Sequence, residues 1–119
     1  MVTIKKNART IRETTCEFEY QDGDKLKTEK IRVRYYSPTT ADQRKLKTER
    51  DENGAYWLSD MLVDRLESLP DLIDEETGKP FVIEQEFLDG LDVRNINAIN
   101  QAIQDDLNPK LTPDSSQNG

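Results

Sequence analysis

The side chains that do most enzyme chemistry are scarce in this sequence. Histidine is absent, and the chain has a single cysteine, Cys16. The commonest general base, the usual partner of a serine or cysteine nucleophile, and the commonest metal ligand are therefore missing. Cys16 lies on the apolar face of a predicted strand, between Thr14 and Phe18. This position favours a small buried hydrophobe over a reactive thiolate. One cysteine also excludes an internal disulfide and a cysteine-based zinc site.

Carboxylates are the one abundant chemical group. Four of them cluster in one predicted loop, Asp71, Asp74, Glu75 and Glu76, and Glu84, Glu86 and Asp89 follow. Calcium loops place acidic oxygens at alternate positions and end on a bidentate glutamate, a spacing that Asp71–Gly78 does not keep. A solvated acidic loop is the better interpretation, and neither glycine-rich phosphate motif occurs. We expect no enzyme activity, no metal and no cofactor.

The length, charge and apolar content of the chain limit the kinds of partner that we expect. The chain has 119 residues, a formal net charge of −7 and a pI of about 4.6. Its length suits one domain, and its acidity repels phosphate backbones. No apolar run approaches the ~20 residues that span a bilayer, and residues 1–7 lack the apolar core of a signal peptide. We expect a cytoplasmic protein without nucleic-acid or membrane partners. An acidic domain that mimics nucleic acid is an alternative.

The first structural element that the sequence predicts is a β-hairpin. Residues alternate from Thr14 to Tyr20 with a period of two, which predicts a half-buried strand. Asp22-Gly23 suits a tight turn, and a return strand over Lys25–Tyr36 has Ile31, Val33 and Tyr35 on its apolar face. A turn centred on Asp22-Gly23 sets Glu13 opposite Arg32 and Thr15 opposite Lys30. The hairpin tip should then project past the core.

Helices are predicted to follow the hairpin. Thr39 and Asp42 suit the start of a helix over residues 40–50. Leu58, Met61, Leu62, Leu66 and Leu69 predict an amphipathic helix that Pro70 ends. Phe81–Ile83 is either a brief strand or a staple into a short helix over Glu84–Leu88, which Gly90 ends. Asp92 then caps a last helix through Leu107.

The predicted fold class is α+β, an N-terminal antiparallel β-hairpin packed on a bundle of three to four helices. Residues 1–10 should be flexible, residues 11–108 one domain, and residues 109–119 a disordered tail rich in polar residues. The expected core comprises Phe18, Ile31, Val33, Leu58, Met61, Leu62, Leu66, Phe87, Ile96, Ile99 and Ile103. Three aromatic residues are candidates for a protein interface: Tyr36, Tyr56 and Trp57.

The order of these parts resembles a known family. Tyr36–Asp42 follows the hairpin as a short "pTaaD" stretch, a leucine-rich helix comes next, and the chain closes on Phe87–Asp92 and Asn97–Ile99. This looks like the small tail assembly chaperones encoded by long-tailed bacteriophages. The resemblance covers about residues 10–110 in organisation. Its motifs are short, and no binding residue is assigned from it.

The resemblance implies a role without catalysis. Members of that family bind the long, helix-rich tape measure protein in the infected cytoplasm and recruit tail tube subunits to it. They are absent from the finished particle, and many are also made as a longer frameshifted product. A structural tail or connector subunit that stays in the particle is the alternative, and a homo-oligomer is left open.

Overall fold

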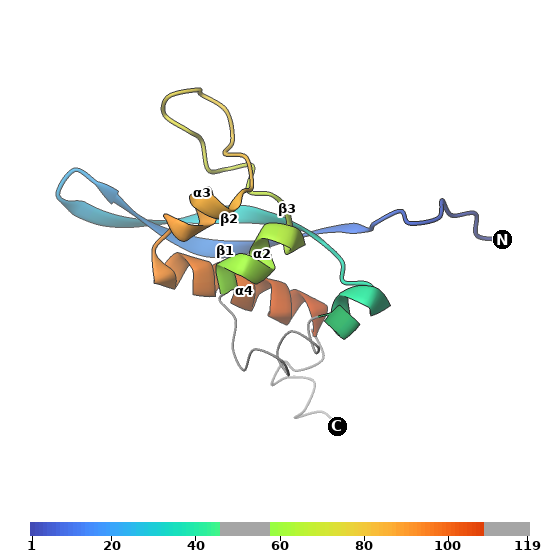
Figure 1. Cartoon of the computed structure of the whole chain (residues 1–119). Helices are drawn as coiled ribbons and strands as arrows, with labels where there is room; N and C mark the ends of the chain where they lie inside the picture. Colours follow the sequence, from blue (N-terminus) through green and yellow to red (C-terminus); the bar gives the residue numbers. More distant parts are fainter. Residues whose placement is uncertain (46–57, 109–119) are drawn as a thin grey trace.

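A computed structural model describes residues 1–45 and 58–108, with side chains described from residue 61 in the second range. Three strands form one antiparallel sheet in the order β1-β2-β3. They are β1 (Ile11–Asp22), β2 (Lys25–Tyr36) and β3 (Leu66–Ser68), and the helices α2, α3 and α4 pack beside them (Figure 1). The predicted α+β class, with a hairpin on a small set of helices, is confirmed.

The hairpin is longer than predicted, and its register differs by two residues. Glu13 lies opposite Arg34 and Thr15 opposite Arg32, whereas the turn predicted from the sequence would place Arg32 and Lys30 there. The reason is the turn, which consists of Gly23 and Asp24 rather than Asp22 and Gly23. Gly23 has a φ of 66°, which glycine adopts without steric cost. A shift of two preserves the side-chain faces, so the assignment of faces was right.

One face of the sheet is packed and the other is solvated. Ile31, Val33 and Tyr35 of β2 are almost completely buried, whereas Arg32 between them is exposed. The three apolar side chains belong to one core with residues of α2, β3, α3 and α4: Leu62, Leu66, Leu69, Leu88, Ile96, Ile99 and Ile103. This one-sided burial follows from the two-residue period of β2.

The helix predicted through Leu69 is wrong in its second half. Helix α2 runs from Leu58 to Arg65, and the next three residues, Leu66–Ser68, form β3 against the edge of β2. The residue before a proline is disfavoured in helical conformation, and Pro70 follows closely. Leu66 and Leu69 are buried in either conformation. The strand additionally gives hydrogen-bond partners to the β2 edge, which no pattern in the sequence signals.

The other predicted helix ends are mostly confirmed. The Asp42 amide donates to Thr39 Oγ1 (3.2 Å), and the Thr39 amide donates to Asp42 Oδ2 (2.9 Å), a reciprocal cap on the helix that begins at residue 40. Residues 46–50 of that predicted helix lie outside the described residues. The side chain of Asp92 accepts from the Arg94 amide (2.8 Å) and caps α4 (Val93–Leu107).

Helix α3 (Gln85–Asp89) is short, and Gly90 ends it as predicted. No strand forms over Phe81–Ile83. Instead the Phe81 ring stacks on Phe87, with centroids 4.7 Å apart, which agrees with the staple alternative. None of the helices in residues 1–45 and 58–108 is long and apolar enough to cross a membrane.

The expected core is largely correct. Seven of its members are buried: Ile31, Val33, Leu62, Leu66, Ile96, Ile99 and Ile103. Phe18 and Phe87 are half-buried against that core, and Met61 is half-buried. The side chain of Leu58 lies outside the described ones. Tyr35, Leu69 and Leu88 are also fully buried and are not among the predicted core residues.

Two polar side chains close the two edges of the sheet. On the β1 edge, Asn95 of α4 accepts from the Glu19 amide and donates to the Glu19 carbonyl, both at 2.9 Å. On the β2 edge, beyond the end of β3, Asp71 Oδ2 accepts from the Arg32 amide at 2.8 Å. Each side chain does what a neighbouring strand would do. Asn95 is the buried polar residue of the core, with 4% exposure.

Asn95→Ala should therefore destabilise the protein by about 1–3 kcal/mol, because the Glu19 backbone groups lose their partners in a partly buried place. Equilibrium denaturation by urea measures this change. Asn97→Ala is the matched control on the exposed face of α4, and it should be neutral or slightly stabilising because alanine favours helix. Equal effects of the two substitutions would show that the Asn95 contact contributes nothing specific.

Candidate functional site

A concave feature lies between three segments of the part of the chain that the structure describes. These are the far half of the hairpin, the loop over residues 71–84, and α3, which lies between them (Figure 1). The space they enclose is a groove of about 960 Å³. That volume is at the upper end of the range for small-molecule sites, so the groove has room for several side chains of a partner.

The floor and walls of the groove are apolar and strongly aromatic. Its aromatic members are Phe18, Tyr20, Phe81 and Phe87. Its aliphatic members are Ile31, Leu72, Ile73 and Leu91. Tyr20 is 39% exposed and Ile73 51% exposed, so apolar surface remains open to solvent here. Aromatic side chains that are open in a concave site supply much of the contact energy when a protein partner binds.

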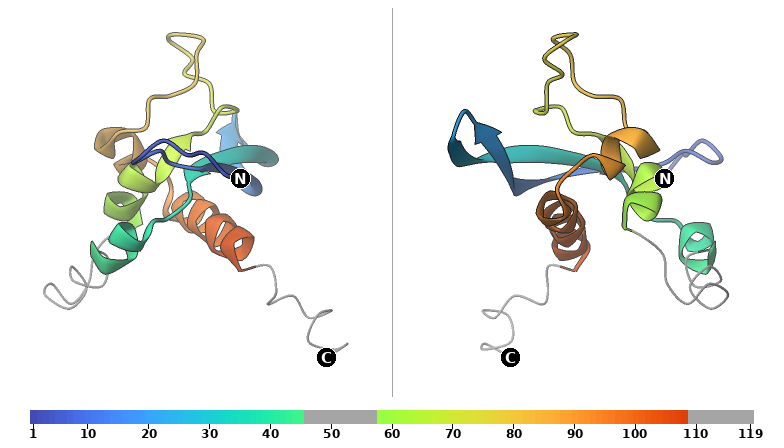
Figure 2. Two further views of the ribbon diagram at one scale, coloured as in Figure 1. Left: turned by 90° about the vertical axis from the view of Figure 1, so that its right-hand side faces the viewer. Right: turned by 60° about the vertical axis from the view of Figure 1, so that its left-hand side comes forward.

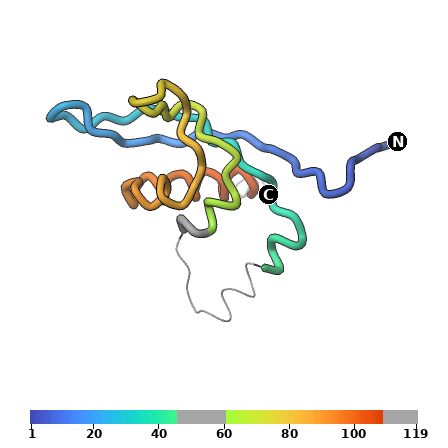
Figure 3. Tube along the Cα trace, turned by 45° about the horizontal axis from the view of Figure 1, so that its top comes forward, coloured from blue at the N-terminus to red at the C-terminus, as the bar shows by residue number. Residues whose placement is uncertain are grey.

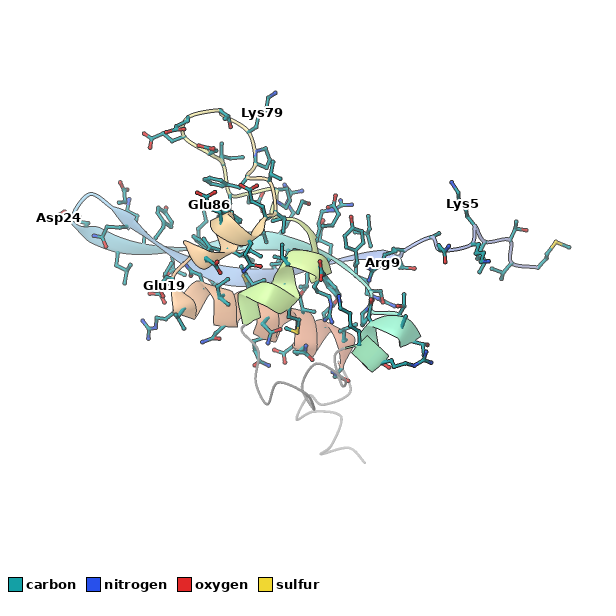
Figure 4. All side chains as sticks on the ribbon, viewed as in Figure 1. Lys5, Arg9, Glu19, Asp24, Lys79 and Glu86 are labelled. Atoms are coloured by element: carbon teal, nitrogen blue, oxygen red, sulfur yellow. The ribbon has the colours of Figure 1, made fainter. Side chains whose placement is uncertain are left out.

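The rim of the groove is acidic. Six carboxylates line it: Glu29, Asp71, Asp74, Glu76, Glu84 and Glu86. No lysine or arginine is among the lining residues that the structure describes. Figure 4 shows Glu86 on α3 between the hairpin and the loop. Carboxylates around one concavity create a negative potential that attracts cationic side chains.

Asp71 fastens one side of the groove to the sheet. Arg32 Nη2 donates to Asp71 Oδ1 at 2.8 Å, and Arg32 Nε donates to Oδ2 at 3.1 Å, beside the backbone bond already described. These hydrogen bonds to Arg32 hold the pKa of the Asp71 carboxyl below its usual value. The loop therefore starts from a fixed point on β2, and the charge of Asp71 is paired with that of Arg32.

The outer part of the loop is ordered by its own hydrogen bonds. The Asp74 amide donates to the Lys79 carbonyl, and the Gly78 amide donates to the Asp74 carbonyl, each at 2.8 Å. The Glu76 amide donates to Asp74 Oδ1 at 2.9 Å, an Asx turn that asparagine and aspartate favour. Gly78 takes a φ of 71°. The acidic loop predicted from the sequence is thus an exposed, closed turn that holds one wall of the groove.

Within residues 1–45 and 58–108, no three ligand-type side chains (His, Cys, Asp or Glu) are placed to share a metal ion. Cys16 lies half-buried on the core face of β1, opposite Ile31. Burial, together with the neighbouring charge of Glu17, raises the pKa of the Cys16 thiol to about 11. The arrangement suits binding of an apolar, cationic surface.

Of the three residues predicted for an interface, one lies away from the groove and two lie outside the described residues. Tyr36 ends β2 and is half-buried beneath the Arg9 guanidinium, whose carbon is 4.9 Å from the ring centroid. Arg9 also forms an ion pair with Asp42 at 2.5 Å, so Tyr36 stands at the base of the N-terminal segment. Tyr56 and Trp57 lie outside the described residues. The structure does not bring Tyr36 to the groove.

Sequence reasoning missed the groove although its parts were visible. The carboxylates at residues 71–76 and 84–86 were noted, and so was the projection of the hairpin beyond the core. What the sequence lacks is the distance between them, because Phe18 and Phe87 are separated by most of the chain. The signal available in the sequence was the pair of aromatic residues, Phe18 and Tyr20, on the apolar face of a hairpin whose tip was predicted to project past the core.

Comparison with models of known protein families, with curated proteins and with solved structures finds no match.

Asp71→Asn should lower the stability of the protein, and the loss should depend on pH. The pKa of Asp71 is lower in the folded protein than in the unfolded chain. Its contribution is therefore fully present above the usual carboxyl pKa and is lost as pH falls through the lowered value. Urea unfolding of both proteins across the acidic range measures the difference, which should be largest near neutral pH. Glu75→Gln, in the same loop but outside the groove lining, should show no such trend.

Cys16 should react slowly with a thiol reagent near neutral pH. With a pKa of about 11 against the ordinary 9.0, its thiolate fraction is lower by a factor on the order of a hundred, and burial restricts access further. Stopped-flow labelling with and without denaturant compares the folded and unfolded rates. Similar rates in both conditions would contradict the assignment of Cys16 as a packing residue.

Proposed function

We propose that this protein is a non-catalytic binding module that holds an apolar, positively charged segment of a partner protein in the aromatic groove. The observation that carries the proposal is one concavity with four aromatic residues within it and six carboxylates around it. Apolar anchors of the partner would fill the floor, and its lysine or arginine residues would meet the rim. Apolar anchors in a pocket with charges at the rim are the usual anatomy of a protein interface.

The charge of the whole chain supports a protein as the partner. A net charge of −7, together with the six carboxylates at the groove, opposes nucleic-acid phosphates. An acidic domain that mimics nucleic acid would display its charges over a convex surface; here they surround apolar side chains.

The resemblance to phage tail assembly chaperones supplies a specific client. In that case the bound segment belongs to the tape measure protein, and tail tube subunits join the complex. A groove suits this role because long helical clients present apolar side chains at regular spacing, the helix-in-groove mode of recognition. The acidic surface would keep the complex soluble.

A structural tail or connector subunit is the second candidate, and the hairpin is the observation that favours it. The hairpin extends beyond the edge closures made by Asn95 and Asp71, and residues 21–30 are all exposed. Figure 3 shows it reaching out on the side opposite to the N-terminus. Strand edges left open in this way can add a strand of a neighbouring subunit.

Tyr20→Ala should weaken capture of the client at least tenfold, because Tyr20 is an exposed aromatic residue that lines the groove. The measurement is affinity capture of the tagged protein from its native source, with mass spectrometry to identify the bound protein, followed by titration of the purified pair. Leu26→Ala is the control, since Leu26 is 63% exposed on the same hairpin but does not line the groove.

Recovery of a long helical protein or a tube subunit that Tyr20→Ala releases and Leu26→Ala retains would support the chaperone proposal. Recovery of a nucleic-acid enzyme would contradict it. Detection of the protein in purified phage particles would favour the structural subunit instead. A client that both variants bind equally would place the interface outside the groove.

A further inference from the structure

We infer that the groove also receives the N-terminal arm of a second copy of this chain, so that the protein associates with itself head to tail. The arm is defined here as residues 1–8. The inference rests on the groove being a binding site, as proposed above. It adds an occupant from the same sequence, and it makes self-association and client binding mutually exclusive.

The arm has the chemistry that the groove selects. Its large apolar side chains are nearly fully open to solvent: Met1 is 117% exposed, Val2 86% and Ile4 81%. Lys5 and Lys6 follow them directly, and residues 1–12 contain no acidic residue although the chain has a net charge of −7. Exposed apolar side chains gain free energy when a partner buries them, and neighbouring lysines favour a partner with an acidic surface.

The base of the arm is fixed, while the arm itself leaves the domain. Arg9 pairs with Asp42 and stacks on Tyr36, and the Ser37 amide donates to the Thr10 carbonyl at 2.8 Å. Before that anchor, the hydrogen bond described is a local one from the Ala8 amide to the Lys5 carbonyl. Eight extended residues span roughly 26–29 Å, which lets the arm reach well beyond its own domain.

The arm and the groove lie at opposite ends of the molecule. Figure 4 shows Lys5 on the arm at one end and Asp24 at the hairpin tip at the other, with Glu86 on the hairpin side of the domain. The two further views in Figure 2 keep the groove segments on one side of the sheet and the arm leaving from its far end. The arm of one copy therefore meets the groove of another, because its own groove faces away.

An interface between different surfaces has a predictable consequence. Each copy offers one arm and one groove, so association is heterologous and extends into a ring or an open chain. This differs from a two-fold dimer, in which both copies use the same patch. A client with apolar and basic residues would displace the arm, and the assemblies would shorten as the client is added.

The test uses two full-length variants with opposite defects. Lys5→Glu/Lys6→Glu makes the arm acidic, and Glu29→Lys/Glu86→Lys makes the groove rim basic; all four positions are exposed. Analytical ultracentrifugation should show concentration-dependent association of the wild-type protein and loss of the larger species for either variant alone. An equimolar mixture should restore the larger species, because the intact arm meets the intact groove and the acidic arm meets the basic rim.

Two controls make the outcome specific. A chain with both pairs of substitutions restores opposite charges and should associate again. Asp24→Lys/Glu75→Lys changes the net charge equally at exposed positions outside the groove and should associate like the wild type. Raising the ionic strength from about 0.01 to about 1 M, which shortens the Debye length from roughly 30 to roughly 3 Å, should weaken association.

A wild-type protein that stays monomeric at all concentrations would overturn the inference, and so would two variants that fail to complement each other. If either happens while Tyr20→Ala still loses the client, the groove binds a partner and the arm does not occupy it. If the variants complement but no client is recovered, the self-association stands and the proposed client binding fails.

Discussion

The apolar row of β2, formed by Ile31, Val33 and Tyr35, is the surface on which the helices and β3 pack. Ile31, Val33 and Tyr35 are the side chains that the sheet contributes most deeply, and helices α2, α3 and α4 add their buried residues to the same cluster. Complete burial of side chains of this size stabilises by roughly 1.5–3 kcal/mol each. Without this row, neither the short helix α3 nor the three-residue strand β3 has a surface to pack on.

Tyr35 links the buried core to a polar side chain at the edge of that core. Its hydroxyl donates to Asp106 Oδ2 near the end of α4, and burial together with this hydrogen bond raises the pKa of the tyrosine. A buried tyrosine needs such a partner for its polar tip. On the solvated face, Arg34 stands between Glu13 at 3.9 Å and Glu67 at 3.1 Å. The hairpin and the β3 segment therefore meet through charge on one face and through packing on the other.

The groove exists because the apolar face of the hairpin is longer than the helices that cover it. The buried row of β2 ends at Ile31. Asn95 contacts the β1 edge nearer the hairpin tip, at Glu19, and Asp71 contacts the β2 edge at Arg32. Phe18 is half-buried against the core, whereas Tyr20, nearer the hairpin tip, is 39% exposed. Both line the groove together with the loop and α3. A buried asparagine is a costly way to end a sheet if left unpaired, and both of its groups are satisfied here. The groove is thus a continuation of the core that is open to solvent.

Local pattern in the sequence determined the α+β class, the packed face of the hairpin, the caps made by Thr39, Asp42 and Asp92, and most of the buried positions. Each follows from neighbouring residues through a period of two or 3.6, or through a short-range hydrogen bond. Tertiary structure alone decided the rest. The register depended on which residues form the turn, and Leu66–Ser68 became a strand because the β2 edge offered hydrogen bonds. The groove assembled from residues 18–31 and 71–91, whose proximity is set by packing and by no local signal.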